Sequence, residues 1–174
     1  ETAEALFRHT RATLIDGVRR SFENPGTGSG PIFPLRPGDT EEPRRSPGFA
    51  SDQTTTGVPG FSPYLRFYLA HQREFEFRIS ALHAEVRQAV ASVSPAHARL
   101  SMLDEALTAL LQAPARKFLA LVPGLLARRF LAVQAEGPDW FTTFAREMEE
   151  ILLAELDVRL LPTRGLLEAV DEAL

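Results

Sequence analysis

The chain has 174 residues, of which 44% are hydrophobic and 24% are charged, a composition typical of a globular protein with its own core. Its formal net charge of −4 argues against general nucleic-acid binding, which depends on a positive field. The absence of cysteine excludes disulfides, thiolate nucleophiles and cysteine-based metal sites, and it fits a reducing compartment.

Residues 2–22 are expected to form the first helix, because apolar side chains recur there at helical spacing. The sequence Asn24-Pro25-Gly26 then ends the pattern with residues that stop helices. The first residues also lack the apolar run of a secretion signal. We therefore expect a cytoplasmic protein.

Residues 24–60 differ in kind from the rest of the chain. They hold seven prolines and seven glycines and show no hydrophobic periodicity, which predicts an extended connector. A connector of this length acts either as a tether or as a strip that docks on another surface. If it docks, its apolar side chains are the anchors. We call these residues the docking strip: Ile32, Phe33, Leu35 and Phe49.

Residues 62–93 carry the clearest helical pattern. Ser62 is expected to cap this helix, and Pro63 takes the first helical position, where a missing N–H costs nothing. Side chains then recur at steps of three and four over four heptads, which indicates a coiled-coil-like seam. Gln72 is its only polar member and a candidate for fixing register. The seam residues are Leu65, Tyr68, Gln72, Phe75, Ile79, Leu82, Val86, Ala89 and Val93.

Aromatic side chains are dense at the start of this helix, and Phe67 and Phe77 lie off the seam. They indicate either a broad core or a second hydrophobic face that needs a protein partner. The pair Arg128-Arg129 lacks a surrounding basic stripe, so protein or solvent contacts are favoured over phosphate. The candidate protein-interface residues are Phe61, Tyr64, Phe67, Tyr68, Phe75, Phe77, Arg128 and Arg129.

The next helix, residues 95–112, is expected to fold back antiparallel on the preceding one. Ser94-Pro95 repeats the cap-and-proline start and leaves only a short turn between the two helices. We expect the leucines of this helix to face inward. They are Leu100, Leu103, Leu107, Leu110 and Leu111.

A third helical stretch is expected over residues 114–135, beginning at its proline, and Pro123-Gly124 should kink or split it. Residues 140–160 follow as a helix that Pro162 stops, and Thr163 caps a short last helix. The most apolar run, residues 118–127, is ten residues long, whereas a membrane span needs about 20. We therefore expect no direct membrane insertion.

The residues that could carry chemistry form no convincing site. None of the four histidines belongs to a His-Glu-x-x-His or Glu-x-x-His motif, so zinc-protease and di-iron patterns are missing. The carboxylates of residues 147–157 lie on an acidic helix, where solvated pairs such as Glu155 with Arg159 explain them. We predict no enzyme activity, no catalytic or metal-binding residues and no cofactor.

These features predict an all-α helical bundle with a long antiparallel hairpin. Its parts are an N-terminal helix (1–23), a Pro/Gly-rich connector (24–61) and a helical bundle domain (62–174). The function we expect is that of a self-associating, non-enzymatic interaction or scaffold protein, with a homodimer as its expected form. The net charge is +3 over residues 62–138 and −6 over 139–174. This asymmetry indicates either two solvated helix faces, the more common case, or packing of these parts within one chain or across a dimer. The alternative is a regulatory bundle that binds a small molecule where Pro123-Gly124 bends the third helix.

Residues 61–174 also resemble a proteobacterial family described as a domain of unknown function. The resemblance rests on Phe61-Ser62-Pro63-Tyr64, on Leu121-Val122-Pro123 before Arg129-Phe130, and on the run from Leu152 to Leu160 ahead of Gly165-Leu166-Leu167. The family supplies no catalytic residues. Its genes lie beside those of OmpA-like proteins and of membrane proteins similar to motor stators. The resemblance therefore implies a cytoplasmic accessory or assembly factor of an envelope complex.

Overall fold

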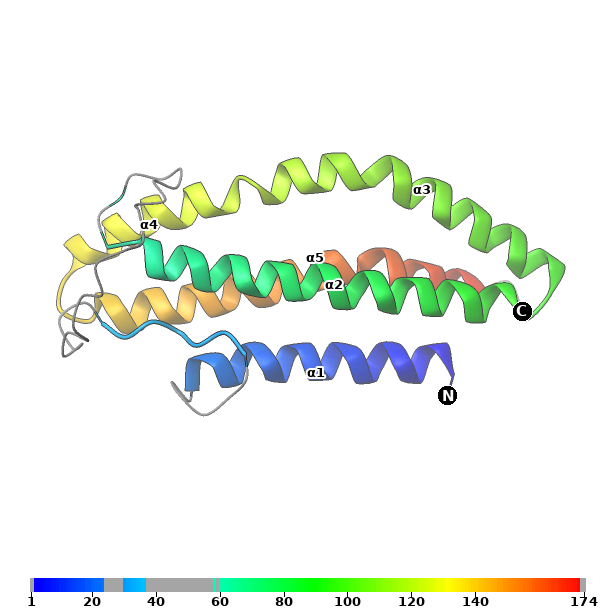
Figure 1. The fold of residues 1–174 in the computed structure, drawn as a ribbon, viewed down its shortest axis with the longest axis horizontal. Coiled ribbons are helices and arrows are strands. Elements are labelled where there is room, and N and C mark those ends of the chain that lie inside the picture. The colour runs from blue at the N-terminus through cyan, green and yellow to red at the C-terminus, as the bar shows by residue number, and fades with distance from the viewer. Residues whose placement is uncertain (1, 24–29, 37–57, 59, 173–174) are drawn as a thin grey trace, which may run out of the picture.

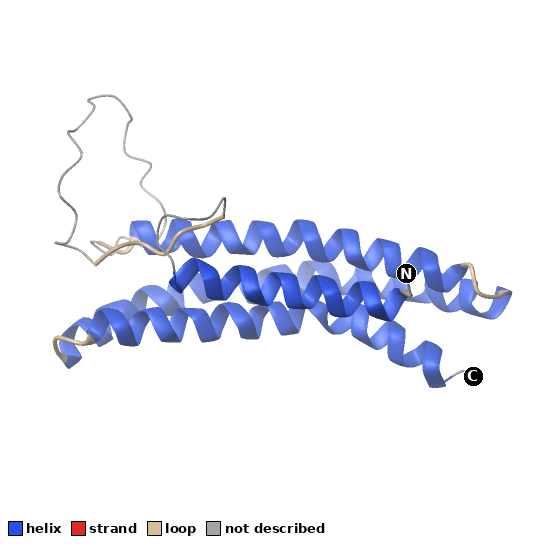
Figure 2. Cartoon of the chain, turned by 90° about the horizontal axis from the view of Figure 1, so that it is seen from below, coloured by secondary structure: helices blue, strands red, loops and turns tan. Residues whose placement is uncertain are grey.

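The computed structural model describes residues 2–23, 30–36, 58 and 60–172, and every regular element in these ranges is a helix (Figures 1 and 2). This confirms the predicted all-α helical bundle. The helices are α1 (Ala3–Glu23), α2 (Ser62–Ala91), α3 (Pro95–Leu119), α4 (Val122–Glu136) and α5 (Trp140–Glu172).

Helices α1, α2 and α5 pack against one another and form the main bundle. α2 and α5 run in the same direction, whereas α1 and the α3–α4 pair run in the opposite one (Figure 1). α3 follows α2 after a short turn, so the antiparallel hairpin is present. Figure 1 shows α3 as a bow above α2 and α5, with α4 returning to the bundle beside the start of α5.

The core follows the line along which α2 meets α1 and α5, and an aromatic cluster closes it where α2 and α5 begin. The rings of this cluster have centroids 5.2 to 6.4 Å apart, in the tilted and edge-on arrangements that aromatic pairs prefer. Its members come from the start of α2, from α4 and from α5, and are Phe61, Tyr64, Phe130 and Phe144.

The seam of α2 is buried from Leu65 to Val86, apart from the half-buried Gln72, and then moves off its predicted positions. Ala89 and Val93 are exposed, and Val90 is buried in their place. An α-helix has 3.6 residues per turn, so a strict 3.5-residue stripe drifts around it over several heptads. The straight helix α2 therefore follows the coiled-coil pattern only over its first three heptads.

Helix boundaries correct several expectations. α3 continues through Pro114 to Leu119, and α5 continues through Pro162. An internal proline removes one backbone hydrogen bond and displaces the carbonyl four residues earlier. The exposed surroundings of Pro114 leave that carbonyl to water, and the packed residues on both sides of Pro162 hold α5 together.

The predicted break at Pro123-Gly124 is confirmed, because α3 ends and α4 begins just before it. The cap of α3 is present, since the Ser94 hydroxyl accepts a hydrogen bond from the His97 backbone N–H at 3.3 Å. The expected Ser62 cap was wrong: Ser62 lies inside α2, and Phe61 takes the cap position without a side-chain bond.

Candidate protein interface

Most of the predicted interface aromatics lie inside the molecule. Phe61, Tyr64, Phe67, Tyr68 and Phe75 have exposed fractions of 4% or less. The face of α2 that seemed to need a partner is covered by the chain itself, and the broad-core interpretation describes these five residues.

Phe67 shows how this face is filled. Its ring lies 5.2 Å from the rings of Phe22 on α1 and Phe33 in the connector. Phe77, on the same helix, remains 78% exposed.

The arginine pair is divided between solvent and an ion-pair network. Arg128 is exposed, and its Nε donates to the carbonyl of Gly124 at 3.4 Å. Arg129 pairs with Glu147 on α5 and with Glu136, both at 2.7 Å. The hydrogen bond from Arg129 lowers the pKa of Glu147. Arg129 thus ties α4 to α5 within the chain.

Residues 30–36 of the connector, which include three members of the docking strip, lie against the main bundle. Phe33 is 6% exposed, and its backbone N–H donates to the carbonyl of Ser21 at 3.0 Å. The Tyr64 hydroxyl donates to the carbonyl of Leu35 at 3.3 Å. The side chains of Ile32 and Leu35 are 44% and 55% exposed, so Phe33 is the anchor among these three. Phe49 lies outside the described residues.

α3 turns a polar face toward the bundle. Its residues His97, Ser101, Asp104 and Thr108 are buried or half-buried, and their steps of four, three and four place them on one side of the helix. The Ser101 hydroxyl donates to the carbonyl of Arg87 on α2 at 3.1 Å. Polar contacts therefore hold the first half of α3 to its neighbours.

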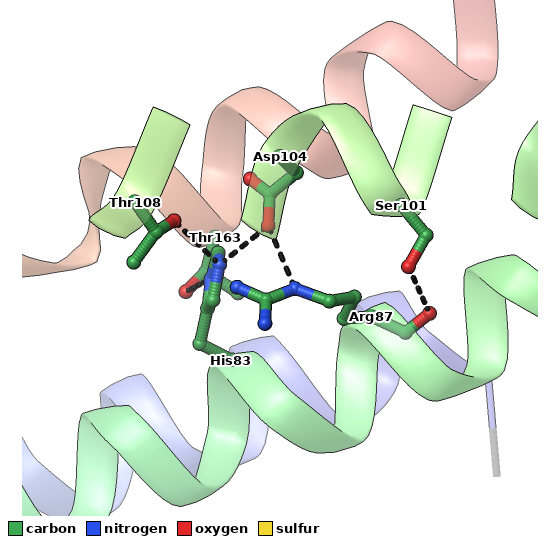
Figure 3. A network of polar contacts seen from close by, with 6 residues as sticks. All are labelled: His83, Arg87, Ser101, Asp104, Thr108 and Thr163. Carbon is green, nitrogen blue, oxygen red and sulfur yellow. Dashed lines mark hydrogen bonds and ion pairs between the residues drawn. The ribbon is translucent and has the colours of Figure 1, made fainter. Parts of the chain in front are cut away.

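His83 is the centre of these contacts (Figure 3). Its Nε2 lies 2.8 Å from Asp104 Oδ2, and its Nδ1 lies 2.8 Å from the hydroxyl of Thr163 on α5. Arg87 Nε donates to the same Asp104 oxygen at 2.9 Å. Three helices meet at one imidazole, and we call His83, Arg87, Asp104 and Thr163 the polar clamp.

The polar clamp contains the residue types of a hydroxyl–histidine–carboxylate triad, but its geometry does not suit catalysis. A nucleophile must be reached by a substrate, and Thr163 is 0% exposed. Because α5 continues through Pro162, Thr163 does not cap a separate helix as its sequence suggested. Its hydroxyl instead connects α5 to His83. Among the described residues, no three histidine or acidic side chains gather as they would around a metal ion.

A second buried network joins α2 to α5. Glu155 is 5% exposed and accepts a hydrogen bond from the Tyr68 hydroxyl. Gln72 Nε2 donates to both Glu155 oxygens at 3.0 and 3.1 Å, and Arg159 pairs with the carboxylate at 2.8 Å. The expected pair of Glu155 with Arg159 is present, but it is buried rather than solvated. Gln72 lies where a polar seam residue fixes the register of two helices.

The opposite side of α3 is apolar and exposed. We call the large apolar residues on α3, on the turn after it and on α4 the outer apolar face; their exposed fractions run from 48% to 73%. Every residue from 109 to 118 is exposed. The members are Met102, Leu103, Leu107, Leu110, Leu111, Phe118, Leu121, Leu125 and Leu131.

The orientation of α3 overturns the expectation that its leucines face the bundle. Of the five, only Leu100 is half-buried, and the other four are exposed. The helical spacing of the leucines favoured their assignment to the core, although a polar stripe runs along α3 beside them. The spacing of Ser101, Asp104 and Thr108 was the signal that could have revealed a second candidate for the inner face.

The same region meets the length and composition of a membrane-crossing helix. Among the described residues, the segment Pro95–Glu136 does so, with a mean hydropathy of 1.4 and 22% burial in its most apolar window. Pro114 lies inside this segment, and the break between α3 and α4 before Pro123 interrupts it. Gly124 is exposed and has no atom within 4 Å of where a side chain would lie, so that bend is open to solvent.

Comparison with known proteins gives a family. No curated protein and no solved structure matches the chain. One family model matches residues 1–172 and therefore covers α1 and the connector as well as the region where the sequence resemblance was found. The chain belongs to this family, which is described as "Protein of unknown function (DUF3348)".

Proposed function

We propose that this chain is a non-enzymatic, cytoplasmic interaction module that binds another polypeptide through the outer apolar face. The observation that supports this proposal most is the orientation of α3, which places polar residues against the bundle and leucines in solvent. Burying one such side chain gains about 1.5–3 kcal/mol. Large apolar side chains that stay exposed along two consecutive helices support an interaction site there.

The polar clamp supports the same function. The bond of His83 to Asp104 holds α3 in one orientation and leaves its leucines outside, and the bond of His83 to Thr163 connects α2 to α5. α4 is held in turn by Arg129 and by the buried Phe130. The outer apolar face is therefore preorganised in the free chain, which lowers the entropy cost of binding.

The test is photo-crosslinking in the native host. Benzoylphenylalanine replaces Leu107 in the full chain, and the matched control carries it in place of Ala12, an exposed residue of α1. The Leu107 variant is expected to form an adduct with a polypeptide, and the Ala12 variant is not. The proposal is contradicted if Leu107 forms no adduct, or adducts with lipid alone.

A further inference from the structure

We infer that the polypeptide bound by the outer apolar face is an acidic amphipathic helix, with an apolar stripe and carboxylates beside that stripe. This inference rests on the proposed function and names the chemistry of the partner. It depends on which charged side chains lie among the exposed leucines. The whole chain has a net charge of −4, whereas the charged side chains among these leucines are cations.

Two exposed cations of α3 lie on the same side as two of its exposed leucines. Arg99 precedes Leu103 by four residues. Lys117 follows Leu110 by seven residues, and Leu110 follows Leu103 by the same number. Seven residues make nearly two full turns of an α-helix. The four side chains therefore lie on one side of α3, with a cation at each end of the leucines.

α4 also carries a cation among its exposed leucines. Arg128 lies three residues after Leu125 and three before Leu131, and all three side chains are exposed. Within the part of the chain that the structure describes, Arg99, Lys117 and Arg128 form no ion pair. Their charges are therefore available to the carboxylates of a partner.

The carboxylates of this region lie away from the leucines. Between residues 99 and 131 the chain has two, Asp104 and Glu105. Asp104 faces the bundle and is paired inside the polar clamp. Glu105 comes two residues after Leu103, which places it about 200° around the helix. The leucine side is therefore apolar and positive, and an apolar segment with carboxylates complements it.

The spacing of the exposed apolar residues on α3 fits a helical partner. Steps of four, three and four form the kind of seam along which two helices pack, and an amphipathic helix binds through such anchors. Residues 99–118 span about 30 Å along the helix axis, so the matching helix has about 20 residues. The apolar residues at these steps are Leu103, Leu107, Leu110 and Pro114.

A second copy of this chain does not complement this face with the same face of its own. Two such faces in contact would bring Arg99, Lys117 and Arg128 of one copy against the same cations of the other, and like charges across an interface repel. The seam of α2, which suggested self-association, is largely buried within its own chain. The complementary surface is therefore a different one, which carries carboxylates.

An anionic lipid surface has the required sign of charge but suits this face less well. Because Arg128 lies between Leu125 and Leu131, lipid that took up these leucines would also take up the guanidinium, at a high cost. A carboxylate of a polypeptide can instead accept two hydrogen bonds from it. Residues 95–136 also contain no Trp or Tyr, the side chains that are enriched at membrane interfaces. These features favour a polypeptide over a membrane.

The test uses two synthetic helical peptides of about 20 residues with the same leucine stripe. One carries glutamates beside the stripe and the other carries lysines there, and fluorescence anisotropy measures their binding to the full chain. We expect the acidic peptide to bind about tenfold more tightly than the basic one, and added salt to weaken its binding.

The charge-reversal variant Lys117→Glu with Arg128→Glu should weaken binding of the acidic peptide about tenfold, because it replaces two attractive contacts with repulsive ones. The matched control is Arg19→Glu with Arg66→Glu, at exposed positions of α1 and α2. It changes the net charge by the same amount and should leave binding unchanged. Circular dichroism should show that both variants keep their helices.

Equal binding of the two peptides, or equal loss in the charge-reversal variant and its control, would overturn the inference. Co-flotation of the chain with phosphatidylglycerol vesicles would also overturn it if the charge-reversal variant abolished the flotation, because the cations would then serve lipid. Sequencing the adduct formed at Leu107 separates this inference from the proposed function. An adduct with a polypeptide segment that lacks acidic residues would keep the proposed function and overturn the inference, and an adduct with lipid alone would contradict both.

Discussion

His71 is a buried histidine between α1 and α2 whose pKa is lowered by its surroundings. Its side chain is 1% exposed, and burial lowers its pKa from 6.5 to about 4. The Ser21 hydroxyl donates to the carbonyl of Val18 at 2.5 Å, so Nε2–H of His71 donates to Ser21 at 3.1 Å. Nδ1 has no hydrogen-bond partner among the residues that the structure describes. The site accommodates only the neutral imidazole between α1 and α2.

This depressed pKa predicts how stability depends on pH. Below pH 6.5 the unfolded chain protonates His71 and the folded chain does not, so the free energy of unfolding falls as the pH drops from 6.5 to about 4. The loss is on the order of 3 kcal/mol, because each tenfold change in proton affinity corresponds to about 1.36 kcal/mol. His71→Leu should remove most of this loss in urea unfolding, and His9→Gln, at an exposed position of α1, should keep it. Parallel curves for His71→Leu and the unaltered chain would contradict the assignment.

At the scale of the elements, α3 owes its orientation to a few polar contacts rather than to apolar burial. The side chains of His83, Arg87 and Asp104 are 9%, 21% and 14% exposed, so their hydrogen bonds form in a largely dry environment. Removing one partner from such a network leaves the others buried and unsatisfied. The bond from Ser101 to α2 adds to the attachment. The first half of α3 is thus attached through the polar clamp, whereas residues 109–118 are exposed.

Asp104→Ala is therefore expected to lower the free energy of unfolding by about 1–3 kcal/mol, because His83 and Arg87 lose their shared acceptor. Amide hydrogen exchange should rise in the first half of α3 more than in α1 or α5. Glu85→Ala, which removes an exposed carboxylate from α2, is the control and should change stability by less than about 0.5 kcal/mol. Equal effects of the two substitutions would show that the polar clamp does not hold α3.

At the scale of the whole molecule, the sequence predicted the all-α class, the hairpin and the position of the break at Pro123 from local rules alone. It did not predict the direction in which α3 faces, because Leu103 and Leu110 follow the same spacing whether their partner is their own chain or another one. The tendency of apolar residues to be buried does not specify whether they are buried within their own chain or against a partner. Helix continuity through Pro114 and Pro162 was also missed, since tertiary packing and solvent decide whether a proline ends a helix or only bends it.

Contacts between residues distant in sequence explain why the aromatic residues of α2 were wrongly predicted to form an interface. Phe67 lies off the seam, and from sequence it resembles a residue that needs a partner protein. Its partners are Phe22 and Phe33, which lie far away in sequence and come together only when α1 and residues 30–36 pack on α2. Gln72 was predicted to fix register, but its acceptor Glu155 lies on a helix whose pairing with α2 no local pattern reveals.

A single engineered cysteine tests the central claim most directly, because this chain contains none. Leu110→Cys places a thiol on the exposed side of α3, where Leu110 is 73% exposed, and Ser101→Cys places one on the side that faces the bundle, where Ser101 is 6% exposed. A maleimide reagent should label the Leu110→Cys chain rapidly and the Ser101→Cys chain only slowly, because α3 turns its polar residues inward. Equal labelling rates, or faster labelling of the Ser101→Cys chain, would contradict the account.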